Sequence, residues 1–354
     1  MRRLAIGAAI TAFAAAAAVG AAPGAGAAVG DARDEAGWIL SAQLPDGSIA
    51  SHADRTFVDP YLSAFGAAGL AAATRATGDP AYAQGAWRFV EWYAAHMDAN
   101  GYVTDYRVVG ETISSTGDAD STDAYAGLFL LAVEAASAAA PDPARLMKLA
   151  PALRSAVAAI RSTQRVDGLT GAKPAWMVAY LMNEAEAYAG LMAASRLALT
   201  VGDRALARDA ALAAARIQRG VDRLWNASTD AFDWAVHPDG ARQATNWAQL
   251  YPDALSQVWA VRYGVVQGPR ARAVLTRFLQ AHPNAHDPNA PDLVDGRVAP
   301  TGYWPGAAIA LRLVDPAAPS RYGAGTVSVA AATGRAWPYS VQVAGDLVRL
   351  TTNL

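Results

Sequence analysis

The sequence lacks cysteine entirely and contains only five histidines among its 354 residues. Without cysteine no disulfide can form, so the stability of the fold must come from its apolar core, for which 53% hydrophobic residues are ample. A surplus of basic residues is also missing, because the formal net charge is -2. Binding to phosphate backbones requires a basic surface, so we expect no nucleic-acid partner.

Long hydrophobic runs are confined to the beginning of the chain. Arg2 and Arg3 precede an apolar run over residues 4–19, and Ala25-Gly26-Ala27 fits a small-residue cleavage site. We interpret residues 1–28 as a signal peptide and residues 29–354 as one catalytic-type domain. Because no later apolar run reaches about 18 residues, we predict a secreted, extracellular protein that does not bind a membrane after signal removal.

Two kinds of helical segment alternate along the rest of the chain. Residues 80–97, 144–160 and 204–225 combine one apolar face with one charged face, as helices on the outside of a protein do. The segments between them carry little charge beyond their first turn, which is typical of buried helices. These apolar segments are residues 61–74, 123–139, 183–199, 253–266 and 303–313. We therefore expect outer amphipathic helices around inner apolar helices.

The connections between these segments alternate as well. Each passage from an outer to an inner helix is long and contains a turn dipeptide, such as Asp46-Gly47 or Asp167-Gly168, whose glycine permits positive φ. The return links are short, and several carry proline near the first helical position. This recurrence predicts an all-α fold, an (α/α)6 toroid of six helical hairpins with its long loops at one end. An open helical solenoid is the alternative.

Three segments resemble the six-hairpin glycosidase superfamily of (α/α)6 toroids. They are GWILSAQLPDGS at residues 37–48, DSTDAYAGLFLL at residues 120–131 and NEAEAYAGL at residues 183–191. The resemblance implies a sugar-binding cleft at the long-loop end, lined by aromatic rings and containing an acid and a base that are Asp or Glu. It identifies no individual family.

Carboxylates recur at the predicted beginnings of the inner helices. Hydrolysis of a glycosidic bond needs one carboxylic acid and one carboxylate, and the candidates are Asp120, Glu186, Asp253, Asp59, Asp118 and Asp123. Asp120 paired with Glu186 or Asp253 is our first choice, followed by Asp59. Each acid alone is also explained as a helix cap or a first-turn charge. Their recurrence at four successive inner helices is what favours a functional cluster.

Aromatic residues lie in or beside the long loops, where flat rings can stack on sugar faces or pack into the core. The candidates for substrate binding are Trp176, Tyr188, Trp234, Trp247, Tyr251, Tyr303 and Trp304. The histidines lack the spacing of a zinc-hydrolase helix, although His282 and His286 are four residues apart. We predict no metal, no cofactor, an oligosaccharide or polysaccharide substrate and a monomeric state.

The function that follows is an exported glycoside hydrolase acting on a neutral glycan. A polysaccharide lyase on the same scaffold would instead use a Tyr or His base near a cation that neutralises a uronate, and Tyr61, Tyr125 and Tyr188 leave this open. A toroid that binds glycans without catalysis is another alternative. Asp118-Ala119-Asp120-Ser121 also resembles the acid motif of class II terpene cyclases, and residues 43–48 resemble their Gln-Trp repeats, with Ser121 and Ile49 departing from those patterns.

Overall fold

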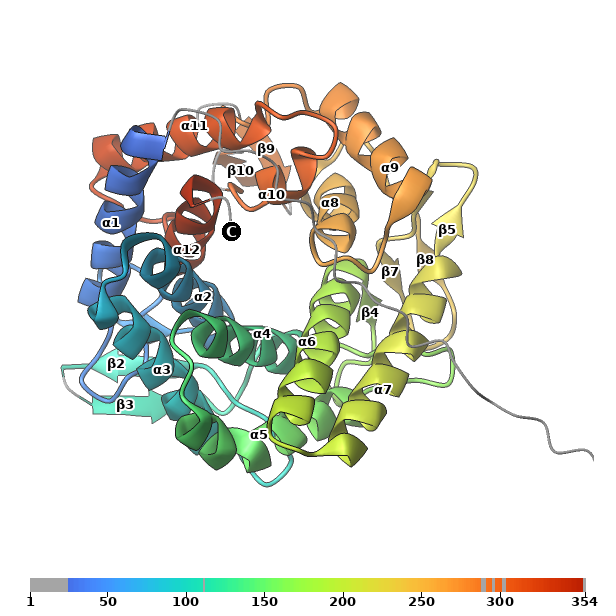
Figure 1. Ribbon diagram of the computed structural model, residues 1–354. Coiled ribbons are helices and arrows are strands. Elements are labelled where there is room, and N and C mark those ends of the chain that lie inside the picture. Colours follow the sequence, from blue (N-terminus) through green and yellow to red (C-terminus); the bar gives the residue numbers. More distant parts are fainter. Residues whose placement is uncertain (1–24, 111, 288–290, 295–296, 301–303, 353–354) are drawn as a thin grey trace, which may run out of the picture.

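Helices that alternate between an inner and an outer layer form a closed ring (Figure 1). The computed structural model describes residues 25–110, 112–287, 291–294, 297–300 and 304–352. In these ranges the outer helices are α1 (Ala25–Ala42), α3 (Pro80–Ala95), α5 (Pro143–Ser162), α7 (Arg204–Asp222), α9 (Gly268–Ala281) and α11 (Ala318–Thr333). The inner helices are α2 (Pro60–Thr77), α4 (Asp123–Ala139), α6 (Leu181–Thr200), α8 (Leu255–Arg262), α10 (Ala307–Leu311) and α12 (Val341–Thr351). The predicted (α/α)6 toroid is confirmed.

Two inner helices are shorter than we expected from the sequence. The predicted helix at residues 253–266 begins with a π-helical turn, η1 (Leu250–Ala254), and its α-helical part ends at Arg262. It ends there because Gly264 has a φ of 76°, outside the helical region. Of the predicted helix at residues 303–313, residue 303 lies outside the described ranges and the helix itself spans Ala307–Leu311. No helix in the described ranges combines the length and apolarity needed to cross a membrane.

Caps and glycines explain where the helices begin and how closely they pack. Asp59 caps α2, since its carboxylate accepts hydrogen bonds from the backbone N–H groups of Tyr61 and Leu62, and Pro60 occupies the first helical position. Inner helices approach each other through glycine. A Cβ on Gly190 of α6 would lie 2.4 Å from Cα of Gly127 in α4. Small residues thus allow the inner helices to close into a narrow ring.

Short antiparallel strands occupy the long loops, which the all-α prediction did not include. One sheet joins β1 (Phe57–Val58), β2 (Tyr106–Val109) and β3 (Thr112–Ser115). A second joins β4 (Ala179–Tyr180), β7 (Ala235–Val236) and β8 (Arg242–Gln243), with β4 residue Ala179 opposite Val236. Two further ribbons pair β5 (Trp225–Asn226) with β6 (Ala231–Phe232), and β9 (Pro291–Val294) with β10 (Arg297–Pro300). The first two sheets link loops of successive hairpins, so they brace the long-loop end.

The turn dipeptides have the backbone conformation that the sequence predicts. Gly47 has a φ of 105° and Gly168 a φ of 88°. In both loops the side chain of a glutamine binds across the turn. Gln43 donates from its amide to the carbonyl of Gly47 at 2.9 Å, and Gln164 donates to that of Gly168 at 3.1 Å. The two loops are therefore equivalent parts of the first and third hairpins.

Candidate active site

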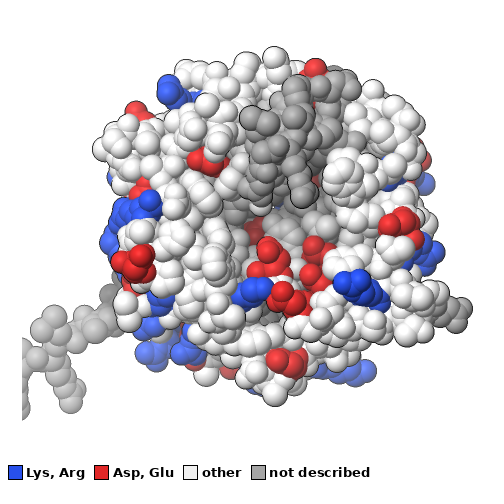
Figure 2. Space-filling model, turned by 180° about the vertical axis from the view of Figure 1, so that it is seen from behind, with Lys and Arg blue, Asp and Glu red and all other residues white. Residues whose placement is uncertain are grey.

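Acidic side chains gather in a hollow on the face opposite that of Figure 1 (Figure 2). A cavity of about 800 Å³ lies at the long-loop end, within the range of small-molecule sites. It is lined by Asp120, Ala172, Lys173, Trp176, Tyr180, Met182, Asn183, Trp234, Gln249, Tyr251, Pro252, Asp253 and Ser256. These residues come from the loops before α4 and α6, the first turn of α6, the β7 hairpin and η1 with the start of α8. We call this cavity the cleft.

Aromatic rings form two walls of the cleft. Trp176 is 51% exposed, and its indole N–H donates to the Tyr180 hydroxyl at 2.9 Å. The ring of Tyr180 stacks on Trp234 with centroids 6.1 Å apart and an interplanar angle of 13°. On the other wall, Tyr251 stacks on Trp304 at 5.4 Å. Rings fixed in this way present flat apolar faces without losing further side-chain freedom, which suits the binding of sugar rings.

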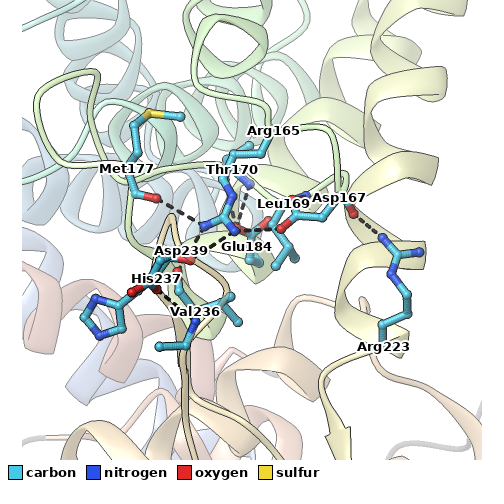
Figure 3. Close-up of polar contacts among 11 residues, drawn as sticks. Arg165, Asp167, Leu169, Thr170, Met177, Glu184, Arg223, Val236, His237 and Asp239 are labelled. Carbon is cyan, nitrogen blue, oxygen red and sulfur yellow. Dashed lines mark hydrogen bonds and ion pairs between the residues drawn. The ribbon is translucent and has the colours of Figure 1, made fainter.

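Arg165 holds together the two loops that carry Trp176 and Trp234 (Figure 3). Its guanidinium donates to the carbonyl oxygens of Met177, Val236 and His237 at 3.0–3.2 Å. It also binds the carboxylate of Asp167 at 2.7 Å. A single planar cation therefore joins carbonyl oxygens of both loops, one of which, that of His237, also accepts from the backbone N–H of Gly240.

Asp120 and Asp253 both line the cleft, as the first choice of catalytic pair requires. The side chain of Asp120 is exposed. Asp253 is only 3% exposed, and its Oδ1 accepts a hydrogen bond from the backbone N–H of Asn246 at 2.7 Å. Burial raises the pKa of Asp253 above its usual value. The two carboxyls therefore share one cavity but have different surroundings.

A third carboxylate, Asp105, was not among the sequence candidates. It precedes β2, and the hydroxyl of Tyr125 donates to its Oδ1 at 2.9 Å. Burial raises the pKa of Asp105 to about 6, and the negative charges of Asp120 and Asp118 act in the same direction. Burial and the charge of Asp105 raise the pKa of Asp59 to about 7. Asp105 lies between the Asn100-Gly101 turn and the second inner helix, which is the one sequence feature that it shares with Asp118 and Asp120.

Asp118, another predicted acid, is bound by a lysine at the rim. Lys173 donates from Nζ to Oδ1 of Asp118 at 2.8 Å and to the carbonyl of Ala119 at 2.6 Å. The hydrogen bond from Lys173 lowers the pKa of Asp118. Lys173 is the one cationic side chain among the described residues of the cleft lining, and Asp118 balances its charge.

Glu186 lies behind the aromatic wall and is fully buried. Its Oε1 accepts hydrogen bonds from the Tyr61 hydroxyl at 2.8 Å and from Nε1 of Trp259 at 3.0 Å. Its Oε2 has no hydrogen-bond partner among the described residues. Burial raises the pKa of Glu186 to about 8. Trp259 in turn contacts Trp304 edge-on at 5.9 Å, so aromatic rings connect Glu186 with the cleft wall.

Asp123 lies inside the protein, outside the set of residues that line the cleft. Its carboxylate accepts hydrogen bonds from the Thr170 hydroxyl at 2.6 Å and from the Asn183 amide at 3.0 Å. The same Thr170 hydroxyl lies 3.1 Å from Oε1 of Glu184, which is also fully buried. Burial raises the pKa of Asp123 to about 7 and that of Glu184 well above its usual range. This pair supports the loop that carries Lys173 and Trp176.

The remaining predicted aromatic residues lie in different places. Tyr188 packs, half-buried, against the core and is not part of the cleft lining. Trp247 is 9% exposed and donates from Nε1 to the carbonyl of Thr229 at 2.9 Å, which is a core position. Tyr303 lies outside the described residues. Within the described ranges, no group of three or more His, Asp or Glu side chains is placed to hold a metal ion.

Solved structures share this architecture over nearly the whole chain. A GH63 mannosylglycerate hydrolase from Thermus thermophilus, in complex with glucose, matches with a TM-score of 0.65 and 13% identity, covering 91% of this chain and 100% of that one. A metal-independent α-mannosidase from Streptococcus pneumoniae, in complex with α-1,6-mannobiose, matches with a TM-score of 0.68 and 11% identity, covering 92% and 94%. A rhamnosidase from Klebsiella oxytoca with rhamnose bound matches with a TM-score of 0.63 and 15% identity, covering 94% and 64%.

These likenesses show the fold of the chain, which is the (α/α)6 toroid of the six-hairpin glycosidases. No protein-family model and no curated protein matches the sequence. The activity must therefore be argued from the site itself.

Proposed function

We propose that this protein is an exported glycoside hydrolase that cleaves a neutral oligosaccharide or polysaccharide in the cleft. The observation that carries the proposal is the convergence of Asp120 and Asp253 on one cavity. These residues are remote in sequence, and the cavity between them has walls formed by Trp176, Trp234 and Tyr251. Two carboxyl groups in an aromatic-walled cleft are what glycoside hydrolysis requires.

The surroundings of the two carboxyls assign their roles. Asp253 is the general acid, because burial favours its protonated form and the Asn246 N–H fixes its orientation. It gives its proton to the glycosidic oxygen as the bond to the anomeric carbon breaks. Asp120, which is exposed, is the carboxylate that takes a proton from the attacking water or attacks the anomeric carbon itself.

The charge of the cleft supports a neutral sugar over a uronate. Recognition of a uronate needs a free cation, whereas Asp118 already binds Lys173. The amino-terminal segment supports export, and the mass of the secreted protein tests it: we expect an N-terminus close to residue 28.

The experiment is turnover and binding of the Asp120→Asn and Asp253→Asn variants on a panel of neutral and acidic glycans. We expect both variants to lose roughly 10²-fold or more in turnover, as removal of an acid or base does, while still binding the glycan. Asp209→Asn on the exposed face of α7 is the matched control and should leave turnover unchanged.

Other outcomes would reject the proposal in distinct ways. Binding without any turnover by the native protein would mark a glycan-binding toroid. Products with an unsaturated sugar that absorbs in the ultraviolet would mark a lyase. Unchanged turnover in both variants would remove Asp120 and Asp253 from the mechanism.

A further inference from the structure

A second cavity, of about 490 Å³, lies on the ring axis among the inner helices, away from the cleft. Its apolar wall consists largely of alanine side chains of α2, α4 and α6, namely Ala64, Ala68, Ala71, Ala135, Ala138 and Ala189. Its lining reaches Arg75 and Arg349, in the last turns of α2 and α12, which places it toward the end of the ring with the short links. We call it the axial cavity.

The charged side chains of the axial cavity leave an excess of positive charge. Its cations are Arg75, Arg262 and Arg349, and its lining contains one acid, Glu134. Both carboxylate oxygens of Glu134 are bound by Arg196, at 2.6 and 2.9 Å. Arg262 binds both oxygens of Asp346, and Arg349 lies 3.7 Å from that same carboxylate. Arg349 therefore shares the negative charge of Asp346 with Arg262. Arg75 has no ion pair with another described residue.

Two buried donors in the lining lack partners among the described residues. The side chain of Arg262 is 1% exposed, yet its Nε has no hydrogen-bond acceptor. The hydroxyl of Tyr263 is also buried and without a partner. The guanidinium of Arg262 lies over the rings of Trp259 and Tyr263, at 4.7 and 5.2 Å. Unpaired buried donors destabilise a folded protein, so a ligand with acceptor oxygens would be stabilised here.

We propose that the axial cavity is a second binding site, whose ligand is an amphipathic carboxylate with a short alkyl chain. The carboxylate accepts hydrogen bonds from Tyr263 and Arg349, and the alkyl chain lies against the alanines of α2 and α4. Favourable charge at helix C-termini explains why arginines end α2 and α12. That effect does not explain why the cavity beside these arginines is lined by alanines and has a volume typical of ligand sites. It also does not explain why the hydroxyl of Tyr263 is buried without a partner among the described residues.

Calorimetric titration of the full-length mature protein with octanoate tests the proposal. We expect saturable binding of one octanoate per chain, and weaker or absent binding of octylammonium and 1-octanol. Tyr263→Phe, which removes only the hydroxyl, and Arg349→Gln should each weaken binding by about tenfold or more. Ala68→Leu, which fills the cavity, should abolish it, whereas Arg208→Gln on the exposed face of α7 should not change it.

The opposite results would overturn the proposal. Absence of saturable binding by the native protein is one such result, and equal affinity for octylammonium is another. Octanoate affinity that is unchanged in both Tyr263→Phe and Ala68→Leu would place the binding elsewhere. These two variants also keep the test decisive if Arg349→Gln does not fold, because neither removes a charge.

Discussion

Thr170 links the protonation of two buried carboxyls. Its hydroxyl lies within hydrogen-bond distance of both Asp123 and Glu184 but has one proton to donate. Burial raises the pKa of both carboxyls, and the charge of Asp123 raises that of Glu184 further, so the folded state favours a proton on this pair. In the unfolded chain they ionise near their ordinary values of 3.8 and 4.5. Above those values the folded state binds more protons than the unfolded state, so its stability falls as pH rises.

The free energy of unfolding should accordingly fall between about pH 4 and the raised pKa values, and for Asp123 the decline ends near pH 7. Glu184→Gln keeps an oxygen at the position of Oε1, which can accept from both the N–H and the hydroxyl of Thr170, and it has no ionisable group. We expect this variant to be more stable than the native protein at pH 8, with a flatter pH profile. Urea unfolding from pH 5 to 8 measures the free energy of unfolding of the native protein and of the variant. The same pH dependence in both would show that Glu184 does not cause the decline.

Some residues of the site could be predicted from the sequence, and others could not. Acids at the beginnings of inner helices could be recognised because helix starts follow from caps and apolar periodicity. Asp120 and Asp123 are three residues apart, yet one lines the cleft and the other is buried. Which way each points depends on the loop around Thr170, packed from elsewhere in the chain. Asp105 escaped prediction because its place is set by the pairing of β2 with β1 and β3.

At the scale of elements, glycine at the crossing of α4 and α6 limits what the helices tolerate. A Cβ on Gly127 would lie 2.6 Å from the carbonyl oxygen of Glu186, which is backbone and cannot move aside easily. Gly127→Ala should therefore destabilise the protein by about 1–3 kcal/mol. Gly37→Ala in α1 is the control, because nothing lies within 4 Å of its Cβ. It should stabilise by up to about 1 kcal/mol. Thermal unfolding measures the stability of both variants. A change of the same sign in both would contradict the close packing at Gly127.

Helices could be predicted from the sequence more completely than strands. Inner and outer helices differ in composition along each segment, so local periodicity is sufficient to distinguish them. Strands such as β4 and β7 have two residues each and pair across different hairpins. No local pattern of alternation can develop over two residues, so tertiary packing alone places them.

For the whole molecule, closure of the ring depends on contacts between the two ends of the chain. The carboxylate of Glu35 in α1 is bound by Arg335 at 2.6 Å and by the Tyr339 hydroxyl at 2.6 Å. Glu35 is 2% exposed, so its removal leaves a cation and a hydroxyl unpaired. We expect Glu35→Ala to destabilise the protein by roughly 1–3 kcal/mol. Chemical denaturation measures the free energy of unfolding of this variant. The control is Asp209→Ala, which removes an exposed ion pair and should change the free energy of unfolding little. A loss no larger than the control's would show that this contact does not hold the ring closed.

The number of hairpins could be predicted because each turn dipeptide marks one long loop. Closure could not be derived in the same way, since an open solenoid has the same local pattern. The contacts that decide it join Glu35 to residues some three hundred positions later. A spacing longer and less regular than that of solenoid repeats, long loops rich in Asp, Trp and Tyr, and the resemblance to known toroids favoured a ring.

The seam between α1 and α12 has one further consequence. Every other pair of neighbouring hairpins in the ring is joined by a chain link, whereas the first and last hairpins meet at this seam without one. Helices α1 and α12 are nevertheless packed against each other there. A circularly permuted chain, joined across this seam and opened at the short link Gly202-Asp203, would have the same neighbours for every helix.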